Sequence, residues 1–191
     1  MRVPLLPVIL LLGLELGCAH RASDKPVEAL DAQTGVTLGT LKAPIELLPS
    51  AQYAARVAHT RLSFAYLGPV EWNRSGTLSY GLWVHIAPGD DGHPGDLRAP
   101  EATTLMLDDG PLALSLAEVP KLGREAYQPV ASWGQTAYFG LTVQALRRMA
   151  ASRKLELDLR APDGSVMTFA PSADARSTLT RYLEARGITG D

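Results

Sequence analysis

The stretch that most constrains how this chain can fold is residues 61–87, where two strand-forming runs flank a turn. It reads RLSFAYLGPVEWNRSGTLSYGLWVHIA. Aromatic and β-branched residues, which favour strands, are frequent in both runs. Gly76, at the end of the Asn-Arg-Ser-Gly segment, supplies the left-handed backbone conformation that a hairpin loop needs. We therefore predict a β-hairpin, in which Gly68-Pro69 interrupts the first strand as a bulge or bend.

Shorter runs on either side of this hairpin predict further strands. Apolar and polar residues alternate in most of them, as in a strand with one buried face. Asp109-Gly110 is a strong turn dipeptide and predicts a second hairpin over residues 102–116. Pro162-Asp163-Gly164 predicts another turn. The other predicted strands cover residues 36–38, 45–48, 127–130, 132–141, 155–160 and 166–170.

Three segments have helical features. Ser50 can cap a short helix over residues 50–59, and Thr142 can cap one over residues 142–154. A last helix is predicted from Ser172 to Gly187, with a C-terminal glycine cap. Its predicted inner stripe consists of Ala175, Leu179, Tyr182, Leu183 and Arg186. The order of elements predicts a mainly β, α+β fold: an antiparallel β-sandwich or curled sheet, with two C-terminal helices closing an open end or an edge.

The N-terminus, residues 1–18, reads MRVPLLPVILLLGLELGC. One positive residue, Arg2, precedes an apolar run from Val3 to Leu14, which is shorter than the ~20 residues of a membrane-spanning helix. The layout predicts a cleaved export signal, with an ordinary secretory signal or an uncleaved segment as alternatives. Cys18 is the only cysteine of the chain, so an exported form cannot pair it within one molecule.

Leu16, Gly17 and Cys18 resemble the lipobox of bacterial lipoproteins, although Glu15 stands where that motif usually carries leucine. The resemblance implies that the signal is removed and that Cys18 is lipidated and becomes the mature N-terminus. The expected organisation is a signal peptide at 1–17, a lipidated cysteine and flexible tether at 18–30, and one β-rich globular domain at 31–191. Ala19 favours an anchor at the periplasmic face of the outer membrane over one in the inner membrane.

The segments YLGPVEWNRSG and SYGLWVHI, with the lead-in LDAQTGVTLGTLKAPIEL, resemble a family of Gram-negative bacterial lipoproteins that has no assigned activity. The resemblance covers residues 30–86 well and the rest of the chain only in general pattern. It implies export and anchoring, and it contributes no catalytic residue.

Two kinds of chemistry can be examined from the residues alone. The acidic and histidine residues of the 85–96 region match neither an EF-hand nor a zinc signature, so we predict no metal and no cofactor. These residues are His85, Asp90, Asp91, His93 and Asp96. A hydrolase needs a nucleophile, a base and an orienting group, and the chain has no G-x-S-x-G sequence. We therefore predict no catalytic residue.

Two clusters are candidates for a partner surface. Arg147 and Arg148, with Arg153 and Lys154, form a basic cluster that is either a solvated helix face or a contact for an acidic partner. Four aromatic residues of the long hairpin either form an exposed binding patch or pack under a second layer. They are Tyr66, Trp72, Tyr80 and Trp83. The net charge of −2 gives no tendency toward nucleic acid.

We therefore expect a membrane-anchored lipoprotein of the cell envelope, with a non-catalytic module that binds an envelope protein or cell-wall component or supports an assembly. The alternative is an envelope hydrolase acting on cell-wall or lipid substrates. A third possibility, a small-ligand carrier, requires an apolar cavity between the sheet and the helices. A pocket in which His85 or His93 meets an Asp or Ser would favour the enzyme, and a shallow apolar or basic patch would favour the binding module.

Overall fold

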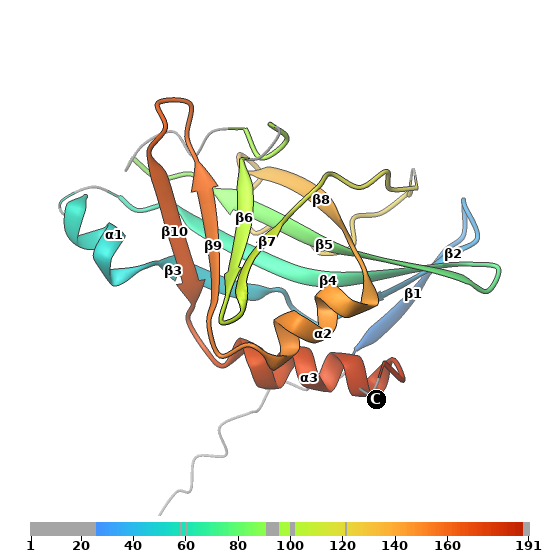
Figure 1. The fold of residues 1–191 in the computed structure, drawn as a ribbon. Helices are drawn as coiled ribbons and strands as arrows, with labels where there is room; N and C mark the ends of the chain where they lie inside the picture. The colour runs from blue at the N-terminus through green and yellow to red at the C-terminus, as the bar shows by residue number, and fades with distance from the viewer. Residues whose placement is uncertain are drawn as a thin grey trace, which may run out of the picture.

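The computed structural model describes residues 26–57, 59, 61–90, 96–99, 102–120 and 122–188. These residues form an open, ten-stranded antiparallel sheet with three helices, α2 and α3 lying side by side across one end of it (Figure 1). The predicted mainly β, α+β fold class is confirmed, and of its two alternatives the structure has the curled sheet rather than the β-sandwich. The strands are β1 (Val27–Asp31), β2 (Val36–Thr40), β3 (Ile45–Pro49), β4 (Phe64–Arg74), β5 (Thr77–Ala87), β6 (Thr103–Leu107), β7 (Gly110–Ala113), β8 (Gln135–Leu141), β9 (Leu155–Arg160) and β10 (Val166–Pro171), and the helices are α1 (Ala51–Arg56), α2 (Val143–Ala151) and α3 (Ala175–Ala185).

The β4–β5 hairpin is the longest element of the sheet, as predicted. Its strands pair along their whole length, from Phe64 opposite Ala87 to Arg74 opposite Thr77. Ser75 and Gly76 form the two-residue loop with φ angles of 50° and 89°. Positive φ at both loop positions matches the right-handed twist of the flanking strands. β8 then pairs with the far side of β5, so β5 lies inside the sheet.

The predicted interruption at Gly68-Pro69 is wrong, because β4 runs through both residues without a bulge. On its other side, β4 pairs with β2 only from Val70 onward and with β3 only up to Leu67. Gly68 and Pro69 therefore lie where β4 changes partners. Pro69 has no N–H to donate, and here neither β2 nor β3 faces it.

The Tyr127 side chain lies against β4 at the point where β4 changes partners. The predicted strand over residues 127–130 is therefore wrong. The buried Tyr127 hydroxyl donates to the Pro69 carbonyl oxygen at 2.7 Å and accepts from the Leu41 N–H at 3.0 Å. A Cβ atom at Gly68 would lie 2.4 Å from the Tyr127 ring, so only glycine leaves room for it. The segment carrying Tyr127 thus covers this face of the sheet as irregular chain.

We expect Tyr127→Phe to lower the free energy of unfolding by about 2–4 kcal/mol, because it leaves a buried N–H and a buried carbonyl without their partner. Urea unfolding followed by circular dichroism measures this. Tyr66→Phe is the matched control, since the Tyr66 ring is half-buried on the same sheet. Equal stability of the two variants would contradict the role given to the Tyr127 hydroxyl.

The sheet curls so that the chain beyond β7 returns to β8. An isolated bridge joins Leu116 to Phe139, and the Ala117 N–H donates to the Tyr138 carbonyl. The inner face of the curl holds the main core, which also receives apolar residues of α2 and α3. Its fully buried members include Leu47, Leu67, Leu82, Leu105, Leu146, Leu157, Phe169 and Tyr182.

The helix caps agree with the sequence in part. Ser50 and Thr142 cap α1 and α2 through hydrogen bonds from the Tyr53 and Ala145 N–H groups, as predicted. The N-cap of α3 is Asp174 rather than Ser172, because the Ser172 N–H and hydroxyl both bind Glu46 of β3. The four apolar and aromatic residues of the predicted inner stripe of α3 are buried, Arg186 is the half-buried C-cap, and Gly187 follows at a φ of 65°.

The globular domain begins before residue 31, so the predicted boundary between tether and domain moves toward the N-terminus, to about residue 27. Residues 27–30 belong to β1, which pairs in full with β2, from Val27 opposite Thr40 to Asp31 opposite Val36. β1 is an edge strand whose residues are mostly exposed, so its sequence is polar and lacks the clear period on which a strand prediction depends. The predicted signal peptide at 1–17 and the predicted lipidation site Cys18 lie outside the described residues.

Candidate functional site: a groove between β6 and β8

A large surface cavity lies where the curled sheet opens between β6 and β8. Ala113 still pairs with Thr104 of β6, whereas Leu116 already bridges to Phe139 of β8, so the intervening chain leaves one strand for another. The cavity, which we call the β6–β8 groove, has a volume of about 860 Å³. It is lined by Arg98, Ala99, Thr103, Thr104, Pro111, Ala113, Leu114, Ser115, Leu116, Phe139 and Arg160.

Both charged residues that line the β6–β8 groove are arginines. Arg98 lies in the Pro/Gly-rich segment of residues 88–100, and a long hydrogen bond of 3.5 Å joins its guanidinium to the Thr136 carbonyl. Arg160 is the exposed last residue of β9, and its side chain has no polar partner among the described residues. The described lining contains no carboxylate. The groove is therefore locally basic, although the whole chain carries a net charge of −2.

Thr103 places an unpaired hydroxyl at this groove. It is 2% exposed and shares the inner face of β6 with Leu105 and Leu107. Its Oγ1 atom has no hydrogen-bond partner. A buried polar atom in this state costs about 1–3 kcal/mol, so a protein rarely keeps one without a reason.

The apolar part of the groove is partly open to solvent. Leu116 is 52% exposed, while Leu114 and Phe139 beside it are buried. Together with the two arginines they make a concave surface with an apolar side and a cationic side. Chemically, such a surface is suited to binding a small molecule through both ion pairing and apolar contact.

The predicted aromatic partner surface is wrong for its two tryptophans, because both faces of the hairpin are covered. Trp83 is fully buried and stacks on His85 and against Tyr127, with ring centroids 5.6 and 5.1 Å apart. Trp72 is 4% exposed and packs against Tyr138. Burial of the two tryptophans agrees with the packing alternative, although the sheet is a single one and not a layer of a sandwich.

The two tyrosines of that set are half-buried and lie on opposite faces of the sheet. Tyr66 lies beside His85, with ring centroids 6.4 Å apart. Tyr80 faces Glu71, and burial and this carboxylate raise the pKa of its hydroxyl. Neither residue lines the β6–β8 groove. The structure therefore does not bring the four aromatic residues together at a site.

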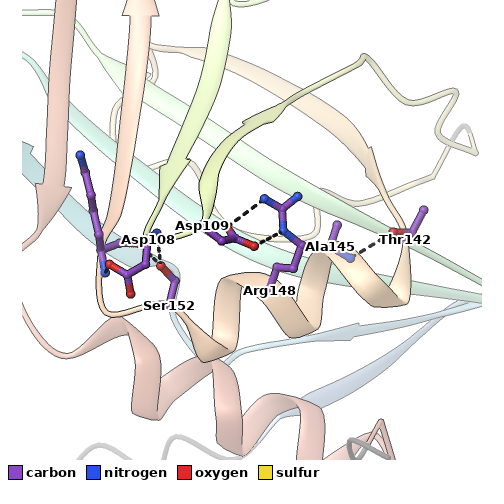
Figure 2. A network of polar contacts seen from close by, with 7 residues as sticks. Asp108, Asp109, Thr142, Ala145, Arg148 and Ser152 are labelled. Carbon is purple, nitrogen blue, oxygen red and sulfur yellow. Dashed lines mark hydrogen bonds and ion pairs between the residues drawn. The ribbon is translucent and has the colours of Figure 1, made fainter.

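The two arginines predicted on the first C-terminal helix are in different situations. Arg148 is held by Asp109 of the β6–β7 turn through bonds of 2.7 and 2.9 Å (Figure 2). This interaction docks α2 on the turn, and the same turn is held by Asp108, which accepts from the Arg153 and Lys154 N–H groups. Arg147 is exposed on α2. Arg148 thus serves the fold, and neither arginine lines the groove.

The residues considered for metal binding are dispersed where the structure describes them. His85 is buried on β5, Asp90 pairs with Arg61 at 3.2 Å, and Asp96 accepts from the Arg98 N–H. Asp91 and His93 lie outside the described residues. No group of three His, Cys, Asp or Glu that could hold a metal occurs in the part of the chain that the structure describes.

His85 is buried in a mainly aromatic environment. Its Nδ1 atom is 2.9 Å from the Thr136 hydroxyl, and its Nε2 atom forms no hydrogen bond of ordinary geometry. Burial lowers the pKa of His85, and the Ala131 carbonyl and the Glu125 carboxylate oppose this only in part. Burial therefore favours the neutral form of the His85 imidazole over the protonated form.

This lowered pKa predicts how stability depends on pH. The unfolded chain binds the proton more readily, near pH 6.5, so the contribution of neutral His85 is complete above that pH and is lost as pH falls below it. We expect the unfolding free energy to fall more steeply from pH 7 to pH 5 in the wild type than in His85→Gln, by at most ~1.4 kcal/mol per pH unit. Urea unfolding across this range, with His59→Gln as a surface control, measures the difference. Parallel curves would contradict it.

The groove residues were not among the sequence-predicted site residues. Arg160 ends an alternating strand, and Arg98 lies in the Pro/Gly-rich segment of residues 88–100. Neither position has a sequence pattern that indicates a site. One usable signal was the loop at 88–100, since functional residues are concentrated on loops held by a rigid scaffold. Thr103, Leu116 and Arg160 become neighbours of one cavity only through the pairing of β6 with β7 and β9.

The fold and the groove define a small antiparallel β-protein with a basic, partly apolar surface cavity. No family model, no curated protein and no solved structure matches the chain. Among the residues that the structure describes, no helix has the length and apolar character needed to cross a membrane.

Proposed function

We propose that the protein is a lipid-anchored lipoprotein of the cell envelope, held at the periplasmic face of the outer membrane, and that its β-rich domain is a non-catalytic binding module. The β6–β8 groove is its binding site. The observation that carries this proposal is the combination, in one cavity, of two arginines and an apolar wall that includes the exposed Leu116. The anchor rests on the Leu16-Gly17-Cys18 sequence, and two or more acyl chains there would hold the protein firmly.

The surroundings of His85 do not favour the alternative of an envelope hydrolase. Its imidazole contacts the Thr136 hydroxyl inside the aromatic layer, it does not line the groove, and its lowered pKa is caused mainly by burial. A small-ligand carrier was expected to have an apolar cavity between the sheet and the helices, whereas the β6–β8 groove is lined by no residue of α2 or α3. The groove can still hold a small molecule, so small ligands are among the occupants that the binding-module proposal allows.

The anchor is tested with Cys18→Ser in cells fed radiolabelled palmitate. We expect the variant to lose the label and to leave the membrane fraction, while the wild type carries the label and sediments with membranes. A variant that still sediments with membranes, cleaved or uncleaved, would contradict the lipid anchor.

The binding site is tested by placing a photo-crosslinking amino acid at Leu116 in the anchored protein. The control carries it at Leu30, which is 64% exposed on β1 and outside the groove. We expect ultraviolet light to produce an adduct of defined mass at position 116 that is absent at position 30. Adducts at position 30 alone would move the binding site away from the groove and overturn its assignment.

A further inference from the structure

We propose that the β6–β8 groove binds a single-chain amphipathic anion, whose carboxylate or phosphate is held by Arg98 and Arg160 and whose hydrocarbon chain lies along Leu116. The inference rests on the proposed function of the groove as a binding site, and it adds the chemical class of the ligand. Four features of the groove support it: its cations, its apolar wall, its unpaired hydroxyl and its size.

The cationic side selects an anion. Arginine presents a planar array of donors that matches a carboxylate or phosphate, and it remains charged at every physiological pH. Arg160 has no polar partner among the described residues, and Arg98 has only the long bond to the Thr136 carbonyl. The nearest acidic residues in sequence are engaged elsewhere: Asp96 accepts from a backbone N–H, and Asp158 accepts from the Thr168 hydroxyl.

The apolar side selects a chain rather than a free inorganic anion. Leu116 is 52% exposed, yet Leu114 and Phe139 next to it in the groove are buried. Covering an exposed apolar side chain stabilises a complex by about 25 cal/mol per Å² removed from water. The volume of about 860 Å³ lies within the range of small-molecule sites.

Thr103 supplies an independent observation at the same place. Its Oγ1 is buried and lacks a partner, and it belongs to a residue that lines the groove. A hydroxyl can rotate to donate to an oxyanion that enters beside it. The free protein then keeps an unsatisfied group that the ligand satisfies, which fits a binding site better than a purely structural position.

The proposal is tested by calorimetric titration of the full chain in neutral phosphatidylcholine nanodiscs, with empty nanodiscs as the blank. The probes are octyl phosphate and octanoate below their micelle concentrations, inorganic phosphate, and neutral octyl glucoside. We expect saturable one-to-one binding of an octyl anion, and affinities for inorganic phosphate and octyl glucoside that are at least tenfold weaker. Octyl phosphate and octanoate distinguish a phosphate headgroup from a carboxylate.

Substitutions assign the contacts. We expect Arg98→Gln and Arg160→Gln each to weaken the octyl anion roughly 10- to 100-fold, as for the loss of a charged hydrogen bond. Arg74→Gln, at the exposed end of β4, is the matched control and should change nothing. Leu116→Gln should weaken the octyl anion and leave inorganic phosphate unaffected, with Leu78→Gln as the equally exposed control on β5. Thr103→Val should weaken binding without lowering the thermal midpoint.

Several results would overturn the proposal. Inorganic phosphate binding as tightly as octyl phosphate would make the groove a simple anion site, and octyl glucoside binding equally would remove the role of the arginines. Equal affinities of the arginine variants and Arg74→Gln would show that the probes bind elsewhere. If no probe binds while the adduct at position 116 persists, the ligand class is wrong and the groove remains the binding site; loss of both overturns the groove itself.

Discussion

Trp83→Ala is expected to lower the free energy of unfolding by about 3–5 kcal/mol, the range observed when a large buried aromatic side chain is removed. Trp83 is fully buried, stacks on His85 and packs against Tyr127, so its loss leaves a cavity between β5 and the segment that covers it. Denaturant unfolding followed by circular dichroism, with the midpoint and slope both fitted, measures the change.

Trp133→Ala is the matched control, because the same side chain is 72% exposed at that position. Its effect on stability should stay within about 0.5 kcal/mol. If the two variants were equally stable, the aromatic residues of the hairpin would not form the buried layer described above. The comparison thus separates a packing role from a partner surface without any ligand being known.

Arg186→Met is expected to cost a similar amount, about 3–5 kcal/mol, because it leaves a nearly buried carboxylate without its partner. The Arg186 side chain is 7% exposed at the end of α3. Its guanidinium lies 2.5 Å from a Glu28 oxygen and 3.6 Å from an oxygen of Glu71, whose side chain is 10% exposed. It also lies against Gly39, where a Cβ atom would approach it to 2.4 Å.

The double variant Arg186→Met with Glu71→Leu should recover most of this loss, since replacing both members of a buried pair by apolar residues is often neutral. Arg148→Met is the comparison for a solvent-exposed pair, and its effect should be clearly smaller than that of Arg186→Met. If the double variant is no more stable than Arg186→Met alone, the cost arises from lost packing of the arginine chain rather than from the stranded Glu71.

The β6–β8 groove and the Tyr127 contact have a common structural origin. In both places a strand changes partners: β4 passes from β2 to β3 at Gly68-Pro69, and the chain after β7 passes from β6 to β8. At the first place Tyr127 satisfies the backbone groups that become free. At the second place a cavity remains, bordered by Thr103 with its unpaired hydroxyl.

Local sequence predicted the elements whose causes are local. Gly76 marked the turn of the long hairpin and Thr142 marked the start of α2. Asp109-Gly110 marked the second turn to within one residue, because its loop is Asp108-Asp109 and Gly110 begins β7. It failed where a distant group changes the outcome. Ser172 looks like a cap but binds Glu46 of β3, and residues 127–130 have a strand-like composition yet place Tyr127 against β4.

The candidate site could not be predicted in the same way. Arg98, Thr103, Leu116 and Arg160 belong to separate segments, and no periodicity relates them. Arg147 and Arg148 were predicted because they are adjacent in sequence, but adjacency on a helix does not reveal that Asp109, from another hairpin, holds Arg148. Contact between segments depends on strand order, which alternation of side chains does not specify.

The sequence by itself therefore determined most of the strands, the hairpin turns, most helix caps and the mainly β class, because these follow from backbone preferences and from the two-residue repeat of side chains. The tertiary structure alone decided that both faces of the β4–β5 hairpin are covered, that Trp83 is buried, and that two arginines share a cavity with an apolar wall. The physical reason is that alternation states which residues share a face, while burial depends on what the rest of the chain places against that face.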